Sequence, residues 1–222
     1  VALMCTMLLA GAAVGSIVYG ILLADFSQMR LIQVIQGTAV VTLALNGIAL
    51  WKQEARDPAR TAFERVEPSF AESMQALRAD PLAVRRLVAL AIGTAGFALQ
   101  DVLLEPYGGQ VLGLSVSGTT FATALLATFG IAGFVVAARA IGAGRDPYRT
   151  ASYGALHGLF GLTCVMFTAP IQTLPLFVVG VALVGFGGGL FAHATLTAAM
   201  RVAPVGQVGL ALGVWGAVQA TA

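Results

Sequence analysis

Residues 151–200 read ASYGALHGLFGLTCVMFTAPIQTLPLFVVGVALVGFGGGLFAHATLTAAM and contain no Asp, Glu, Lys or Arg. A membrane-spanning helix needs about 20 predominantly apolar residues, so this stretch is too long for one crossing. Pro170 and Pro175 divide it, because proline removes a backbone donor and marks a turn between helices. The stretch therefore predicts two consecutive membrane helices.

The composition of the whole chain indicates the same class of protein. Apolar residues make up 58% of the chain, charged residues make up 10%, and the mean hydropathy is +0.89. Soluble domains carry roughly a quarter of charged residues. The net charge of +2 gives no indication of nucleic-acid binding. The strands of a membrane barrel would alternate polar and apolar residues, and these runs do not. We therefore predict an all-helical integral membrane protein.

Seven apolar runs are long enough to be considered as membrane spans. They cover residues 1–24, 31–51, 87–107, 118–140, 151–169, 174–197 and 208–222. The first run opens at Val1 without a basic leader, which argues against a signal peptide. The last run stops at Ala222, before a full crossing. We expect the chain to be an interior portion of a longer multi-pass protein.

The positions of the basic residues predict the orientation, because Lys and Arg are retained in cytoplasmic loops. Arg30, after the first run, is the one exception to an alternating pattern. The other eleven follow the second, fourth and sixth runs: Lys52, Arg56, Arg60, Arg65, Arg78, Arg85, Arg86, Arg139, Arg145, Arg149 and Arg201. These three loops are therefore expected on the cytoplasmic side.

The long loop, residues 52–86, has an organisation of its own. Phe70, Met74 and Leu77 recur at helical spacing, so residues 68–79 are expected to form an amphipathic helix at the membrane surface. Asp-Pro pairs at 57–58, 80–81 and 146–147 are typical of helix starts, with Asp as the N-cap and Pro at the first helical position. The last two pairs are expected to start the third and fifth spans.

Glycines four residues apart recur inside the spans. Small residues let helices approach closely, so each such pair predicts a packing face. The pairs are Gly11 and Gly15, Gly154 and Gly158, Gly185 and Gly189, and Gly209 and Gly213.

Two carboxylates interrupt an otherwise uncharged segment at QDVLLEPYGGQ, residues 100–110. Asp101 follows Arg86 by about 22 Å of helix rise, which places it in the outer half of a hydrocarbon core about 30 Å thick. An ionised Asp there costs roughly 2.5–3.5 kcal/mol, so it should face the bundle interior, a partner or a wet cavity. Glu105 shares its face one turn further out. Pro106, Gly108 and Gly109 are expected to end the helix.

Two interpretations of these acids remain open. In the first, Gln100, Asp101 and Glu105 form a polar gating site, with Arg30 as the basic partner on that side. In the second, Glu105 is a solvated residue at a helix end and Asp101 caps neighbouring backbone.

Two histidines, His157 and His193, lie in the cytoplasmic halves of their spans. His193 continues the stripe of Gly185 and Gly189, so its imidazole could ligate the magnesium of a chlorin ring lying on a flat glycine surface. Alternatively it forms a hydrogen bond with a neighbouring helix. His157, beside Gly158, is the second candidate ligand.

No pattern typical of an enzyme is visible. The run GFGGG, residues 185–189, lacks the Lys-Ser/Thr of a nucleotide loop and lies within a span. There is no nucleophile with a base and no metalloenzyme spacing. We therefore expect a protein that is not an enzyme.

Three strings carry a resemblance to a known family: RTAFERVEPSFAESM at 60–74, FALQDVLLEPYGGQVLGLSVSGTT at 97–120 and GFGGGLFAHATLTAAM at 185–200. The chain resembles the PucC/LhaA family of purple phototrophic bacteria, the bacteriochlorophyll delivery branch of the major facilitator superfamily. The resemblance covers the whole chain, and QDVLLEPYGG is its most specific part.

The resemblance implies a bundle of twelve helices, of which about seven are present. Residues 1–51 would be the last two spans of the N-terminal half, 52–86 the loop between the halves, and 87–222 the first five spans of the C-terminal half. It also implies a protein of the bacterial inner, intracytoplasmic photosynthetic membrane. This protein would assist assembly of light-harvesting antenna complexes by delivering or handling bacteriochlorophyll. Antenna polypeptides, the reaction centre and membrane lipids would be its partners.

A second hypothesis is a proton-coupled secondary transporter of a porphyrin-like or other small molecule. Asp101 and Glu105 would be its switch. The loop GAGRDPYR, residues 142–149, keeps only part of the superfamily's loop motif, which weighs against an ordinary alternating-access cycle.

Overall fold

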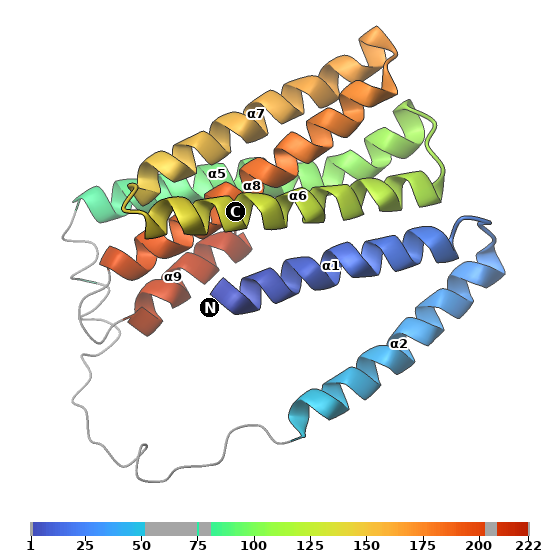
Figure 1. The fold of residues 1–222 in the computed structure, drawn as a ribbon, viewed down its shortest axis with the longest axis horizontal. Helices are drawn as coiled ribbons and strands as arrows, with labels where there is room; N and C mark the ends of the chain where they lie inside the picture. The colour runs from blue at the N-terminus through green and yellow to red at the C-terminus, as the bar shows by residue number, and fades with distance from the viewer. Residues whose placement is uncertain (1, 52–74, 76–80, 203–207, 222) are drawn as a thin grey trace.

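The computed structural model describes residues 2–51, 75, 81–202 and 208–221, and for Asp101 it describes the backbone alone. All regular secondary structure in these ranges is helical (Figure 1). The elements are α1 (Ala2–Leu22), α2 (Gln28–Leu50), α5 (Pro81–Pro106), η1 (Tyr107–Val111), α6 (Val116–Gly142), α7 (Pro147–Ile171), α8 (Leu174–Val202) and α9 (Val208–Thr221).

Five of these helices are long and apolar enough to cross a membrane: Gln28–Leu50, Val84–Val111, Val116–Gly142, Pro147–Ile171 and Leu174–Arg201. The apolar segment Thr6–Leu22 of α1 is shorter. The prediction of an all-helical, multi-pass membrane protein is thereby confirmed. The predicted amphipathic helix at 68–79 lies, except for Gln75, outside the described residues.

The described loops alternate between the two ends of the bundle. Residues 23–27, 112–115 and 172–173 lie at one end, here called the Glu105 end, and residues 143–146 lie at the opposite end, the Arg145 end (Figure 1). Arg30 is therefore separated from Arg139, Arg145 and Arg149, as the charge pattern predicts. That the Arg145 end faces the cytoplasm stays a prediction.

Side-chain caps fix where the helices begin. Asp146 accepts a hydrogen bond from the backbone N–H of Tyr148 at 3.1 Å, and Pro147 occupies the first turn of α7, which confirms that helix start. α5 begins at Pro81, while Asp80 lies outside the described residues. Gln172 ends α7 with a left-handed backbone at φ 54°, and α8 starts two residues later. The predicted division between Pro170 and Pro175 is confirmed.

The end of α5 agrees with the prediction in part. The α-helix ends at Pro106, one of the residues expected to end it, but the helical backbone continues through Gly108 and Gly109 as the π-helical turn η1, in which the N–H of Leu112 donates to the carbonyl of Tyr107 at 3.2 Å. Pro106 lacks a donor and its ring crowds the preceding turn, and the wider π turn restores the pairing of the following carbonyls. The turn to α6 comes at Gly113, whose φ of 69° favours glycine.

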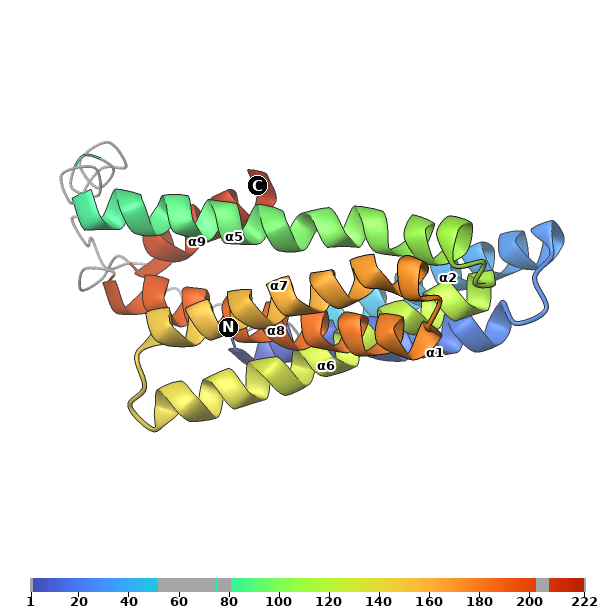
Figure 2. The same cartoon turned by 90° about the horizontal axis from the view of Figure 1, so that it is seen from above.

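α8 is the central helix of the bundle, with α6 and α7 packed along it (Figures 1 and 2). Glycines permit both contacts. A Cβ built on Gly154 would lie 2.7 Å from the carbonyl oxygen of Gly187, and one on Gly161 would lie 2.7 Å from that of Gly180. On the other side, a Cβ on Gly133 would lie 3.1 Å from the backbone nitrogen of Leu190. The backbones therefore touch on both faces of α8.

The predicted packing role is confirmed for Gly154 and Gly158 and for Gly185 and Gly189, and it is wrong for the other two pairs within the described structure. Gly11, Gly209 and Gly213 have no heavy atom of another element within 4 Å of a built Cβ, and Gly15 meets only Tyr19 of its own helix, at 3.9 Å. A small residue permits a close contact, but it does not supply the neighbour.

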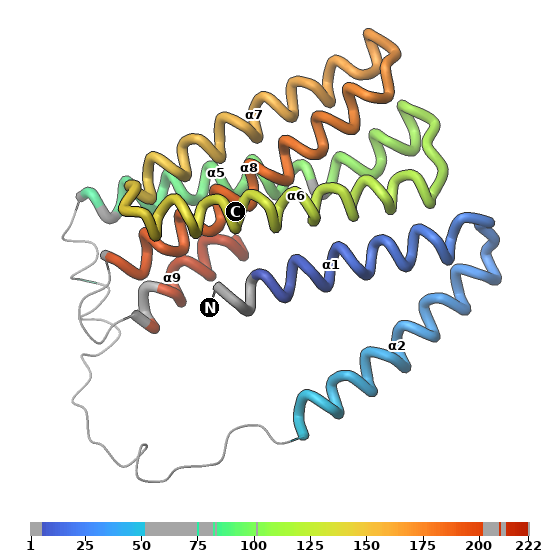
Figure 3. Tube along the Cα trace, in the orientation of Figure 1, coloured from blue at the N-terminus to red at the C-terminus, as the bar shows by residue number. Residues whose placement is uncertain are grey.

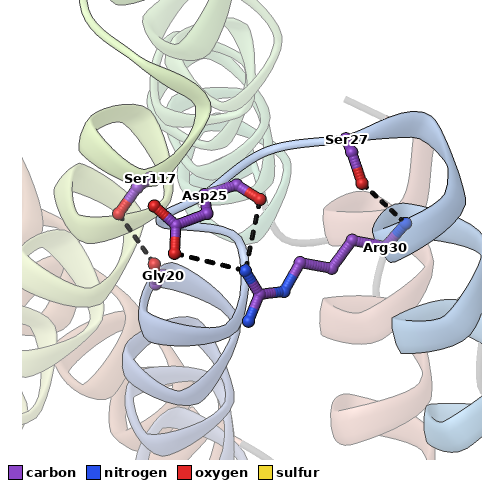
Figure 4. A network of polar contacts seen from close by, with 5 residues as sticks. All are labelled: Gly20, Asp25, Ser27, Arg30 and Ser117. Atoms are coloured by element: carbon purple, nitrogen blue, oxygen red, sulfur yellow. Dashed lines mark hydrogen bonds and ion pairs between the residues drawn. The ribbon is translucent and has the colours of Figure 1, made fainter.

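α1 and α2 behave differently from each other. α1 packs along α6, while α2 diverges from the bundle and has no buried residue (Figures 1 and 3). At the Glu105 end, Gly20 of α1 lies against the ring of Phe121 in α6, because a built Cβ would lie 3.1 Å from that ring. The Ser117 hydroxyl of α6 donates to the Gly20 carbonyl at 2.7 Å (Figure 4). A polar bond and an aromatic contact thus join two helices far apart in sequence.

Candidate functional site: the Glu105 end and the two histidines

Glu105 connects two helices at the Glu105 end. The hydroxyl of Thr123 in α6 donates to Oε1 of Glu105 in α5 at 2.9 Å. A hydrogen bond to an ionised acceptor is stronger than a neutral one. Gln100, one of the predicted gating residues, is buried with 7% of its surface exposed. The side chain of Asp101 lies outside the described residues, so its predicted pairing with Glu105 stays a prediction.

Arg30 forms its ion pair outside the contact between Glu105 and Thr123. Its Nη1 lies 3.4 Å from the carboxylate of Asp25 and 3.3 Å from the Asp25 carbonyl oxygen (Figure 4). The two side chains are 44% and 93% exposed, so the ion pair contributes at most about 1 kcal/mol. In the structure the ion-pair partner of Arg30 is therefore Asp25, in the loop that precedes α2, and not Glu105; a pairing of Arg30 with Asp101, whose side chain lies outside the described residues, stays a prediction.

Two contacts at this end were not predicted. The first is the bond from Ser117 to Gly20 described above. The second is made by Tyr107 of η1, whose hydroxyl accepts a hydrogen bond from the backbone N–H of Ala169 in α7 at 3.3 Å. A π turn often marks a functional position, and the sequence signal for this one was a proline followed by two glycines before the next helix. The Glu105 end is thus held by side-chain bonds between α1, α5, α6 and α7.

The bond between Thr123 and Glu105 can be measured by a double-mutant cycle. We expect Thr123→Val and Glu105→Ala to show a coupling energy of about 1 kcal/mol in the free energy of unfolding, because either change removes the same charge-assisted bond. Thr128→Val is the matched control, since its hydroxyl bonds to the Ala124 carbonyl of its own helix. A coupling of the same size between Thr128→Val and Glu105→Ala would contradict the assignment.

His193 is enclosed in the bundle, with 8% of its surface exposed. The ring of Phe134 in α6 meets it edge-on, with ring centroids 4.4 Å apart. Nε2 lies 3.5 Å from the hydroxyl of Thr197, and Nδ1 is buried without a hydrogen-bond partner among the described residues. The ring therefore extends the α6–α8 contact.

The glycine surface beside His193 is occupied by α6. A Cβ on Gly185 would lie 3.0 Å from Cα of Leu126, and a Cβ on Gly189 would lie 2.9 Å from the backbone nitrogen of Phe134. A macrocycle could not lie on this face while α6 is in place. Gly185 and Gly189 are helix-packing positions in this structure, which corrects the idea of an open, flat surface at these two residues. Ligation by His193 stays untested.

His157 lies at the edge of α7 and is half-buried. Its Nδ1 is 2.7 Å from the carbonyl oxygen of Tyr153, one turn earlier. Its ring meets Phe186 of α8 in a T-shaped contact, with centroids 5.4 Å apart. The two histidines are therefore on different faces of the bundle core and do not form one site. Within the described ranges, no group of three or more His, Cys, Asp or Glu side chains is placed to hold a metal ion.

Several apolar helices of membrane-crossing length, packed through glycine contacts, define a multi-pass helical membrane protein. Lipid contact follows from this class. The chain belongs to the PUCC protein family, whose model matches residues 1–222.

Individual relatives agree with the family assignment. The chain is 51% identical to Protein PucC of Rhodovulum sulfidophilum and 49% identical to Protein PucC of Rhodobacter capsulatus, in each case over 100% of this chain and 49% of the relative. It is 28% identical to the bacteriochlorophyll synthase 44.5 kDa chain of Rhodobacter capsulatus, over 96% of this chain and 50% of the relative. The chain thus spans about half the length of these curated relatives. No solved structure matches it.

Proposed function

We propose that this chain is part of a membrane assembly factor for photosynthetic light-harvesting antenna complexes that handles bacteriochlorophyll. The observation that carries the proposal is the family match over the whole chain. A relative whose name refers to bacteriochlorophyll synthase points to the same pigment. The protein would act in the inner, intracytoplasmic membrane by binding pigment and antenna polypeptides, with the reaction centre as a further partner, and would not itself be an enzyme.

The architecture proposed for the whole protein is a bundle of twelve helices like that of the major facilitator superfamily. The described residues contain seven α-helices, five of them of membrane-crossing length, in about half the length of the relatives, and the other half leaves room for the five more that this number requires. On this proposal, α1 and α2 belong to the first half, residues 52–86 connect the halves, and α5 to α9 belong to the second half. The packing of α1 on α6 would then be a contact between halves.

The proposal is tested by purifying the full-length protein from its native membrane in mild detergent. We expect bacteriochlorophyll, measured by absorption, and antenna polypeptides, identified by mass spectrometry, to co-purify with it. A strain lacking the protein should accumulate less antenna, and the full-length gene should restore it. A preparation free of pigment and antenna polypeptides, from a strain whose antenna content does not depend on the protein, would overturn the proposal.

Proton-coupled transport of a porphyrin-like molecule is the second candidate. It is favoured by one observation, the bond between Glu105 and Thr123, because protonation of the carboxylate would weaken a contact between two helices. Two results together would favour this candidate over the first. The purified protein would carry no pigment or antenna polypeptides, and it would catalyse proton-dependent flux in liposomes that is lost in the Asp101→Asn and Glu105→Gln variants.

A further inference from the structure

We propose that His157, rather than His193, supplies the axial nitrogen ligand for a magnesium chlorin bound on the exposed surface of α7. The inference rests on the proposed function, because it assigns the pigment a place on this chain. It is carried by four features of the residue: its tautomer, its surroundings, its depth and the contrast with His193.

The hydrogen bond of Nδ1 fixes the tautomer. The carbonyl oxygen of Tyr153, 2.7 Å from Nδ1, can only accept a hydrogen bond, so Nδ1 carries the proton. In the neutral ring, Nε2 then presents a lone pair. Among the described residues, Nε2 has no hydrogen-bond partner. Histidines that bind metals usually donate their other N–H to a carbonyl or carboxylate in this way. His157 is therefore oriented as a metal ligand.

The surroundings of His157 are apolar, aromatic and exposed. Tyr153, Leu156 and Phe160, within one turn of His157, are 56%, 60% and 64% exposed. The Phe186 ring of α8 holds the imidazole edge-on from the bundle side. A large apolar ring on this surface would gain contacts with the three exposed side chains. No helix of the described structure covers it, in contrast to the face of His193.

At the depth of His157 in the membrane, a ring nitrogen without a bonding partner is energetically unfavourable. It follows Pro147, at the start of α7, by ten residues, or about 15 Å of helix, which is near the middle of a hydrocarbon core about 30 Å thick. Polar groups at that depth are expensive and are usually paired or functional. Ligation of magnesium satisfies the lone pair without a second hydrogen-bonding helix. The macrocycle meanwhile shields the site from lipid.

His193 lacks these properties. It is buried to more than nine-tenths, and both Phe134 and the α6 backbone occupy the space beside it. A chlorin could reach it only if α6 separated from α8. The glycine contacts between these helices oppose that separation, because both backbones would lose their closest packing.

The test compares two pigments that differ only in the metal: bacteriochlorophyll a and the magnesium-free bacteriopheophytin a. The full-length protein, its His157→Leu variant and a matched His193→Gln control are placed in lipid nanodiscs, and each pigment is titrated by fluorescence. We expect the unaltered protein to bind the magnesium pigment at least about tenfold more tightly than the magnesium-free one. In His157→Leu the affinity for the magnesium pigment should fall to that for the magnesium-free pigment. His193→Gln should still bind the magnesium pigment more tightly.

A second readout is the absorption band of the bound magnesium pigment that reports its number of axial ligands. It should change in His157→Leu and stay unchanged in His193→Gln. Because His157 is half-exposed, the helix should form in its variant, which circular dichroism checks. A preference that survives His157→Leu, or that is lost in His193→Gln, overturns the inference. Equal binding of both pigments by the unaltered protein overturns the inference and leaves the proposed function in place, whereas binding of neither counts against both.

Discussion

Gly189→Ala should destabilise the protein by about 3 kcal/mol, although alanine is the better helix former. The added Cβ would overlap the carbonyl oxygen of Gly130 and lie 2.9 Å from the backbone nitrogen of Phe134. Both obstacles are backbone atoms of α6, which cannot rotate away, so the two helices must separate. Overpacking a close contact costs typically 1–3 kcal/mol and occasionally more, which outweighs the gain of about 1 kcal/mol from helix propensity.

The matched control is Gly96→Ala in α5. Gly96 is exposed, and nothing lies within 4 Å of its built Cβ. This change should leave stability unaltered or raise it by up to about 1 kcal/mol, the propensity gain alone. Thermal unfolding in detergent, followed by circular dichroism, measures both variants. The α6–α8 contact would be misassigned if Gly189→Ala melted at or above the temperature of Gly96→Ala.

Phe191→Ala is expected to have the next largest effect, also about 3 kcal/mol, because it detaches α5 from the bundle core. The Phe191 ring lies over Gly93 of α5, where a built Cβ would be 2.7 Å from the ring edge, and it packs against Phe97 with centroids 5.5 Å apart. Phe97 in turn lies against Gly158 of α7, 2.7 Å from its built Cβ. Truncating a buried Phe removes its contacts and leaves a cavity, at a cost of about 3–5 kcal/mol in soluble cores.

The lower end of that range applies here, because helices in lipid are held by packing and not by exclusion of water. Phe167→Ala is the control: it makes the same chemical change in a side chain that is 53% exposed on α7. It should change the melting temperature little. If the two variants lowered the melting temperature by comparable amounts, the packing of the Phe191 ring would not be what holds α5 against the bundle core.

The sequence was sufficient to predict the helices, because each depends on a local property. The length of an uncharged run predicts a span, Asp146 with Pro147 predicts a start, and Pro170 with Pro175 predicts a boundary. The end of α5 could not be predicted in this way. Whether Pro106 stops a helix depends on whether the following carbonyls find other donors, and here the donors come from the π turn.

The candidate site was less predictable, because it depends on which faces are covered. Glycine spacing is the same at Gly185 and Gly189 as at Gly11 and Gly15, yet within the described residues only the first pair meets another helix. For the same reason, the sequence ranked His193 above His157, since it could not reveal that α6 fills the glycine surface. The ion pair of Arg30 with Asp25 was missed because a partner was sought across helices, while Asp25 lies only five residues earlier in the sequence.

The contact between α1 and α6 has a consequence for how the polypeptide is connected. α1 precedes residues 52–74 and α6 follows them, and the two helices are joined by the Ser117 bond and the Phe121 ring at Gly20, and by the packing of Leu9 3.8 Å from the built Cβ of Gly130. We therefore expect the peptide bonds of residues 52–74 to be dispensable for holding the two parts together. A gene divided within these residues should yield two fragments that associate in the membrane and are isolated as one complex.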